Sequence, residues 1–295
     1  MMPETKISGS LSTVKIGDSY PVRVMGVINL ARNSFYSGSV KTTDEEIEET
    51  ILRMKQDGAN ILDVGARSTA PYRTHDIPLE TEKRLLSSAV KRIANLVDIP
   101  ISVDTTRYEP AKTALRQGAT ILNDVYGLTQ KDAPKLAALV SSHDCSIVIT
   151  AHEKRFRRSS DTISRVCNSL EKSITFANAH GIDSEKITID PGIGFFKDEK
   201  LSNVDWNCTV IARLDELRKL GRPILVGVSR KSFIGKLTGR KSPDLRLNGS
   251  LSATAVAIYN GAHAIRTHDV LETSEASKIA YAISLRKRFN LPELV

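Results

Sequence analysis

The sequence has few cysteines and no long apolar run, and these shortages exclude several classes of protein. Its three cysteines, Cys145, Cys167 and Cys208, are an odd number without Cys-x-x-Cys spacing, so neither a disulfide framework nor a zinc site is expected. Residues 1–9 lack the apolar core of a signal peptide, and no run reaches the length of a transmembrane helix. We therefore expect a cytoplasmic protein with no membrane partner.

Motifs of nucleic-acid and nucleotide binding are also missing. The chain carries 42 Lys and Arg against 34 Asp and Glu, but there is no zinc-finger spacing, RNP-type aromatic motif or basic tail. No G-x-x-x-x-G-K-[ST] occurs, and residues 191–194 lack the third glycine of a dinucleotide fingerprint. The net charge of +8 fits an enzyme that attracts small anionic substrates, and we expect no nucleic-acid partner.

What is present is a regular alternation of strands and helices over 295 residues. Eight β-branched, apolar runs predict buried strands at 22–28, 61–64, 99–103, 120–122, 145–150, 186–189, 223–228 and 263–267. Amphipathic stretches predict helices at 44–56, 80–96, 110–117, 133–142, 162–180, 205–220, 249–260 and 274–288. This order favours an α/β fold, a (β/α)₈ TIM barrel in one domain at 22–290, over an open doubly wound sheet. Residues 1–20 predict a short β-hairpin, with its turn at Gly9-Ser10, that plugs the bottom of the barrel.

Polar side chains follow nearly every predicted strand. In a barrel the C-terminal ends of the strands share one mouth, where active sites form. Asp63, Asp124 and Asp269 are most simply interpreted as N-caps of the helices that follow the strands. Lys231, Arg266 and His268 follow the last two strands, where barrels commonly hold a phosphate, and they predict an anion site.

Three hydrogen-bond acceptors in the middle of the chain predict a second part of the site, beside the anion-binding part. Asp104, Asn123 and Asp190 follow the third, fourth and sixth strands. A carboxylate accepts paired N–H bonds from an amino-pyrimidine edge much as it accepts an arginine fork, although carboxylates also hold divalent metals. The sequence therefore predicts a ligand with a flat polar ring at one end and a phosphate at the other.

Seven segments in order along the chain resemble the dihydropteroate synthase family of pterin-binding barrels. They are residues 25–30, 63–69, 102–105, 121–125, 190–195, 229–235 and 266–269. The resemblance implies a transferase that condenses 6-hydroxymethyl-7,8-dihydropterin diphosphate with 4-aminobenzoate and releases pyrophosphate, in folate biosynthesis. It also implies a homodimer.

The resemblance assigns roles to individual residues. Asp104, Asn123, Asp190 and Lys231 would bind the pterin, and the two carboxylates and the lysine would also be the catalytic groups. The diphosphate would be bound by Asn29, Arg266 and His268, with Mg²⁺ as the cofactor on Asn29. Thr69 and Ser232 would lie toward the arylamine, and Arg67, which departs from the family pattern, is a further candidate for binding it.

The first, second and fifth loops depart from the family pattern. Arg32 and Asn33 stand in the first loop and Arg67 in the second, while Ala151 precedes His152 and the basic run 154–158 in the fifth. Two hypotheses remain: these are solvated loop charges, or Arg32, Arg67 or Arg73 binds an arylamine that carries a ribosyl phosphate, as in methanopterin synthesis. Rival functions are a pterin-dependent methyltransferase acting on a corrinoid protein and a non-catalytic pterin-binding homologue.

Overall fold

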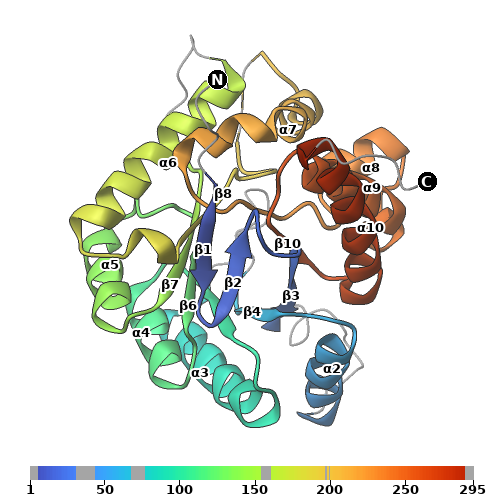
Figure 1. Ribbon diagram of the computed structural model, residues 1–295. Coiled ribbons are helices and arrows are strands. Elements are labelled where there is room, and N and C mark those ends of the chain that lie inside the picture. The colour runs from blue at the N-terminus through green and yellow to red at the C-terminus, as the bar shows by residue number, and fades with distance from the viewer. Residues whose placement is uncertain are drawn as a thin grey trace.

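Eight parallel strands form the centre of the protein, and helices surround them (Figure 1). This computed structural model describes residues 6–30, 44–67, 77–153, 161–196, 198 and 200–289. The parallel strands are β3 (Arg23–Asn29), β4 (Ile61–Gly65), β5 (Ile101–Asp104), β6 (Ile121–Asp124), β7 (Ser146–Thr150), β8 (Ile187–Asp190), β9 (Leu225–Val226) and β10 (Ala264–Thr267). Their order is β8-β7-β6-β5-β4-β3-β10-β9, and a parallel bridge between Ile189 and Ile224 joins the two ends. The sheet is therefore nearly closed, and the barrel prediction is confirmed over the open sheet.

The helices form an outer layer that covers the barrel. They are α2 (Asp44–Gln56), α3 (Leu79–Leu96), α4 (Tyr108–Arg116), α5 (Ala133–Ser142), α6 (Thr162–Ala179), α7 (Asn203–Ala212), α8 (Ser232–Thr238), α9 (Leu247–Tyr259) and α10 (Val270–Phe289). Short 3₁₀ segments are η1 (Ser184–Lys186), η2 (Leu214–Leu220) and η3 (Pro243–Arg246). Among the described residues, no helix is both long and apolar enough to cross a bilayer.

Alternation along the strands creates two apolar layers, because successive side chains point to opposite faces of the sheet. On β4, Leu62 and Val64 belong to the large cluster between sheet and helices. Ile61 instead belongs to a smaller cluster with Met25, Ile121 and other inward-facing residues. The same alternation places Asp63 on the inner face of the barrel, two residues beyond Ile61.

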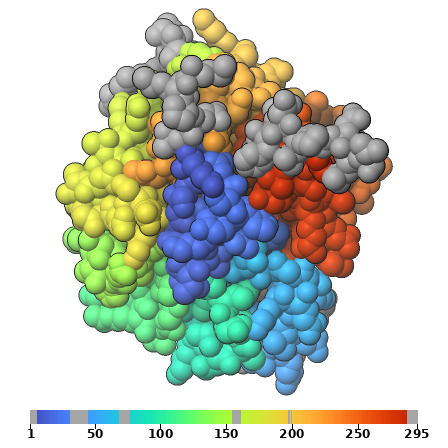
Figure 2. Space-filling view, in the orientation of Figure 1, coloured from blue at the N-terminus to red at the C-terminus, as the bar shows by residue number. Residues whose placement is uncertain are grey.

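The N-terminal hairpin closes one end of the barrel. It consists of β1 (Ser8–Leu11) and β2 (Val14–Gly17), and Figure 2 shows this segment covering the centre of that face. Leu11 and Ile16 are completely buried in the inner apolar cluster of the barrel. The prediction of a plugging hairpin is therefore confirmed.

The predicted position of the hairpin turn is wrong. Leu11 pairs with Val14, so the turn lies at residues 12–13 and Gly9 is inside a strand. A Cβ on Gly9 would lie 2.8 Å from the carbonyl oxygen of Glu185, so this glycine permits close packing against η1 and does not form a turn.

A buried carboxylate attaches the hairpin to the barrel. Asp18 accepts two hydrogen bonds from Arg218, at 2.8 and 3.0 Å, and one from the backbone N–H of Ile7 at 2.8 Å. The Nε2 atom of His263 lies 3.2 Å from Asp18, and Nδ1 of the same ring accepts from the Ile224 N–H. Burial by itself would raise the pKa of Asp18, but the hydrogen bonds from His263, Arg218 and Ile7 lower it below its ordinary value.

Three other details differ from the sequence prediction. The helix expected over 205–220 ends at Ala212 and continues as the 3₁₀ segment η2. The strand expected over 223–228 has only Leu225 and Val226 in regular ladder pairing. Helix α8 and segment η3 were not predicted, because seven and four residues are too few to show a helical period.

Candidate active site

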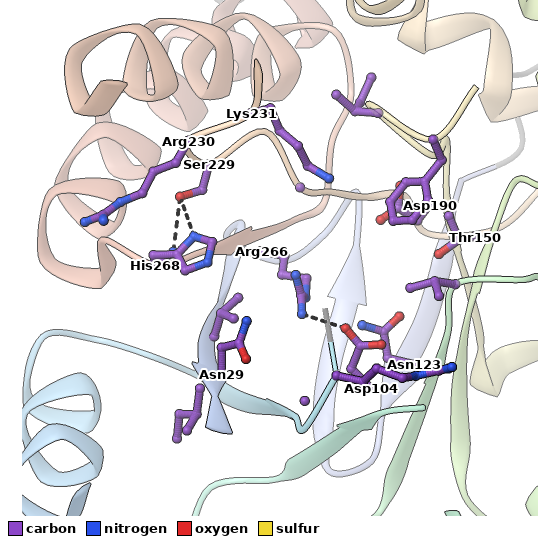
Figure 3. Close-up of a pocket in the computed structure, with 18 of the residues that line it drawn as sticks. Asn29, Asp104, Asn123, Thr150, Asp190, Ser229, Arg230, Lys231, Arg266 and His268 are labelled. Atoms are coloured by element: carbon purple, nitrogen blue, oxygen red, sulfur yellow. Dashed lines mark hydrogen bonds and ion pairs between the residues drawn. The ribbon is translucent and has the colours of Figure 1, made fainter. Parts of the chain in front are cut away.

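A cavity of about 230 Å³ opens at the C-terminal ends of the barrel strands. Eight of the ten side chains predicted for the site line it: Asn29, Arg67, Asp104, Asn123, Asp190, Lys231, Arg266 and His268. Figure 3 shows Asp104, Asn123 and Asp190 on one side of this cavity and Ser229 and His268 on the other, with Arg266 between them. The predicted acceptors and the predicted anion-binding groups therefore share one cavity.

The acceptor side consists of buried side chains at the ends of β5, β6 and β8. Asp104 is 5% exposed, Asn123 3% and Asp190 9%. Burial raises the pKa of Asp190, while the N–H of Gly192, Lys231 and Arg266 oppose that rise. Oδ1 of Asp104 is buried without a hydrogen-bond partner in the part of the chain described. Such an oxygen is costly to bury without a partner, so it keeps its capacity to accept an N–H.

Arg266 links the acceptor side to the rest of the cavity. Its Nε donates to Asp63 at 2.6 Å and its Nη2 donates to Asp104 at 3.0 Å. Burial would lower the pKa of Arg266, but Asp63 and Asp104 raise it above its ordinary value. The guanidinium therefore stays charged in the cavity, where its location beside two carboxylates could not be foreseen from the sequence.

Asp63 corrects an interpretation made from the sequence. It is not a helix cap, because it lies inside β4 with no exposed surface and accepts from Arg266 and from Nδ2 of Asn123. The sequence did contain a signal, since Asp63 is a carboxylate at an inward-facing position of an apolar strand. Asp124 does have a local role, because it accepts the backbone N–H groups of Tyr126 and Leu128.

Lys231 places an ammonium over the cavity from the loop before α8. Its Nζ lies 4.7 Å from the centroid of the Phe195 ring. Burial lowers the pKa of Lys231 to about 8, with Asp190 and Asp104 opposing this shift and Arg266 adding to it. Gly194 lies beside the lysine, and its N–H donates to the buried Oδ1 of Asn207 at 2.7 Å. Gly192 has a φ of +74°, a left-handed conformation that glycine adopts readily in a tight turn.

Ser229 and His268 form a hydrogen-bonded pair at the opposite side of the cavity. The Ser229 hydroxyl oxygen lies 3.0 Å from Nδ1 of His268 and accepts the backbone N–H of the same residue at 3.2 Å. Asn29, at the end of β3, lines the cavity near His268 in Figure 3. These groups are suited to bind an anion and, through the amide oxygen, a hard cation.

Arg230 supports the loop that carries Ser229 and Lys231. Its backbone has a φ of 58°, a conformation that side-chain-bearing residues rarely adopt. Two ion pairs hold it: Nη2 donates to Asp269 at 2.6 Å and Nη1 donates to Asp244 at 2.6 Å. The backbone N–H also donates to Ser250. The left-handed turn brings both of its neighbours to the cavity.

Of the three residues predicted to bind the arylamine, the structure places one at the cavity. Arg67 lines the cavity and donates from Nη2 to Thr106 at 2.8 Å. Ser232 is the first residue of α8, is exposed, and is not among the described lining residues. Thr69, Arg32, Asn33, Arg73 and the basic run 154–158 lie outside the described residues.

Comparison with known proteins agrees with this geometry. The family model described as pterin binding enzyme matches residues 25–268. The dihydropteroate synthase of Escherichia coli (strain K12) is 34% identical over 267 residues, which cover 90% of this chain and 92% of the relative. The Xanthomonas albilineans dihydropteroate synthase solved with 4-aminobenzoic acid has a TM-score of 0.83 and 33% identity, covering 95% of this chain and 98% of that one. A structure of the same enzyme with 7,8-dihydropteroate has a TM-score of 0.80 and 32% identity, covering 94% and 98%. The chain therefore belongs to the dihydropteroate synthase family of pterin-binding transferases.

Proposed function

We propose that this enzyme condenses 6-hydroxymethyl-7,8-dihydropterin diphosphate with an arylamine and releases pyrophosphate, as a cytoplasmic step of folate biosynthesis. The observation that carries the proposal is the division of one cavity into buried acceptors and cationic donors. The ligands of the Xanthomonas albilineans enzyme, 4-aminobenzoic acid and 7,8-dihydropteroate, support it, because they are an arylamine and a pterin joined to one.

In this proposal the acceptor side binds the pterin. Asp104, Asn123 and Asp190 accept the N–H groups of the amino-pyrimidine edge, and the unpaired Oδ1 of Asp104 is the clearest candidate for one of these bonds. Lys231 donates to the carbonyl and ring nitrogen from the opposite direction. A pterin held in this way places its methyl diphosphate toward His268 and Asn29, the far side of the cavity in Figure 3.

The opposite side binds the leaving group. Arg266 and His268 supply charge-assisted donors to the diphosphate. Asn29 fits a Mg²⁺ site, because it lines this side, its amide group includes an oxygen ligand, and Mg²⁺ usually combines few protein ligands with substrate phosphates and water. When bound, the ion would neutralise charge that develops on the departing pyrophosphate.

The chemistry needs no protein nucleophile. Departure of pyrophosphate leaves a cationic pterin methylene, which the amine traps with loss of a proton. Asp104 and Asp190 lie where they stabilise this cation, and their burial makes the interaction stronger than it would be in water. The residues proposed as catalytic are thus Asp104, Asp190 and Lys231.

The identity of the arylamine substrate depends on residues in the loops around the cavity. Arg67, Thr69 and Ser232 are proposed to bind the arylamine, and Arg67 supplies a cation to the cavity. A cation there suits the carboxylate of 4-aminobenzoate or the phosphate of a ribosyl-phosphate arylamine of methanopterin synthesis. Condensation rates with the two amines distinguish these substrates, and a strong preference for 4-aminobenzoate would end the phosphorylated alternative.

The test of the whole proposal is pyrophosphate release. The enzyme is incubated with the pterin diphosphate, Mg²⁺ and a panel of arylamines, and each reaction is repeated without amine. Amine-dependent release supports the proposal. Pterin binding without turnover would instead indicate the non-catalytic homologue, and methyl transfer from a methylpterin to a corrinoid protein would indicate the methyltransferase.

We also propose that the enzyme is a homodimer. Helices α9 and α10 pack against each other and expose several large apolar side chains: Val256, Tyr259, Leu271, Ile279 and Ile283, between 41% and 66% exposed. A group of this kind on neighbouring helices is typical of a protein interface.

A further inference from the structure

Asp63 connects two side chains of the cavity without lining it. Its carboxylate, which has no exposed surface, accepts from Nε of Arg266 at 2.6 Å and from Nδ2 of Asn123 at 3.1 Å, both at Oδ2. The three residues come from β4, β10 and β6. One atom of a residue that does not line the cavity therefore constrains two residues that do.

The contact with Asn123 determines which way its amide points. A carboxylate oxygen only accepts, so the amide must turn its NH₂ group toward Asp63. The carbonyl oxygen Oδ1 is then the atom that Asn123 can offer to a ligand in the cavity. Without a carboxylate at position 63, the NH₂ group could face the ligand instead, and an N–H donor on the ligand would meet another donor.

The contact between Asp63 and Arg266 determines how many carboxylate oxygens of Asp104 are left for a ligand. Arg266 divides its donors, with Nε on Asp63 and Nη2 on Oδ2 of Asp104. Oδ1 of Asp104 consequently stays without a partner among the described residues. If Asp63 were neutral, the planar guanidinium could rotate to pair with both oxygens of Asp104, as arginine and carboxylate commonly do.

We propose that Asp63 is a positioning residue of the pterin site, which turns Asn123 to present its amide oxygen and shares Arg266 so that Asp104 keeps one oxygen for the ligand. The inference rests on the proposed function, because the ligand it concerns is the amino-pyrimidine edge of the pterin. It assigns Asp63 no contact with substrate.

Asp63 also affects the pKa of Asp104. The pH dependence of pterin binding is therefore a measurement that a residue with only a structural role would not change. Burial raises the pKa of Asp104 to about 7, Arg266 and Arg67 oppose the rise, and the negative charges of Asp63 and Asp124 add to it. Removing the charge at position 63 should therefore lower the pKa of Asp104. Pterin binding, which uses the ionised carboxylate, should then persist to lower pH even though it is weaker overall.

The experiment measures binding of 6-hydroxymethyl-7,8-dihydropterin as a function of pH, by calorimetry, for the wild type, Asp63→Asn and Asp18→Asn. Asp18 is also a buried carboxylate that accepts from an arginine, but it lies at the hairpin end of the barrel. We expect Asp63→Asn to weaken binding by about tenfold or more, the value of one charged hydrogen bond, and to move the acid limb to lower pH. Asp18→Asn should lower thermal stability and leave both quantities unchanged.

The outcomes separate the inference from the proposed function. If the wild type does not bind the pterin, the proposed function fails. If the wild type binds and a folded Asp63→Asn protein binds equally well with the same acid limb, only the role of Asp63 is overturned. Weaker binding with an unmoved limb would also overturn it, because this result indicates general destabilisation.

An exchange variant tests the contact between Asp63 and Asn123 through thermal stability, independently of pterin binding. Asn123→Asp alone places two carboxylates in contact, whereas the double variant with Asp63→Asn restores one amide and one carboxylate with the hydrogen bond reversed. We expect the double variant to unfold at a higher temperature than either single variant. Additive destabilisation in this double-mutant cycle would contradict the contact on which the proposal depends.

Discussion

The hydroxyl of Ser229 meets His268 twice, accepting its backbone N–H at 3.2 Å and lying 3.0 Å from ring atom Nδ1. Because the oxygen already accepts from the backbone, its own proton is available to Nδ1. A ring that accepts at Nδ1 carries its proton at Nε2 when neutral. The pair therefore favours an imidazole that presents an Nε2–H donor.

From this relationship we expect Ser229→Ala to impair use of the pterin diphosphate. The KM for that substrate should rise by about three- to tenfold, the effect of one lost hydrogen bond, while binding of a pterin without the diphosphate stays close to wild type. Ser252→Ala is the matched control, since that hydroxyl is exposed and donates to a backbone carbonyl of its own helix, α9. Equal losses with both pterins would contradict a specific effect on His268.

Replacing Lys231 with methionine should remove activity without unfolding the protein. The loss of a preorganised cation beside the reacting ring is expected to lower kcat/KM by about 100-fold or more. Its pKa is lowered by burial, so the charged form is disfavoured in the folded state. The melting temperature should thus stay level or rise, as often happens at functional sites. A large drop in melting temperature with full activity in the surviving protein would refute this assignment.

The pH dependence of kcat/KM should have a narrow maximum. Asp104, whose pKa burial raises to about 7, must lose its proton to accept from the pterin, so activity should rise as pH increases through about 7. Lys231, whose pKa burial lowers to about 8, loses its charge above that pH, so activity should fall there. Asp104→Asn should abolish the acid limb and weaken pterin binding. An acid limb that persists in this variant would belong to another group.

Asp18→Asn should destabilise the closure of the barrel by the hairpin. The substitution leaves Arg218 and His263 without a charged acceptor, and breaking such a buried pair costs about 3 kcal/mol. The pKa of Asp18 is lower in the folded state, so its stabilising effect is present above about pH 4 and is lost as pH falls through the folded value. Urea unfolding at pH 7 and at pH 3 tests this: the difference between variant and wild type should shrink at the lower pH.

If the enzyme is a dimer through α9 and α10, charged substitutions on α10 should convert it to a monomer. Ile279 and Ile283 are 66% and 54% exposed, so Ile279→Glu with Ile283→Glu should not disturb the folded chain. Light scattering during gel filtration should show the mass of the wild type halved in this variant. A control substitution, Leu52→Glu on α2, changes a side chain that is 41% exposed and should leave the mass unchanged. A wild type that is already monomeric would end this part of the proposal.

The sequence predicted the barrel because strands and helices in a βα unit have different periods and are punctuated by turn residues. Boundaries in β4, α2 and α5 agree to within one residue. Predictions were poorer where tertiary contacts override local pattern. Gly9 is paired within a strand, where its missing side chain lets the backbone of Glu185 approach, and the turn lies at residues 12–13.

By itself, the sequence determined the fold, the family and the set of polar residues at the strand ends, because parallel strands in a barrel must bring those ends together. Only the tertiary structure decided which of them pair. Arg266 and Asp63 are 203 residues apart in the chain and Arg266 and Asp104 are 162 apart. Whether such side chains meet depends on strand order, register and inward or outward orientation, and these are fixed only when the sheet closes on itself.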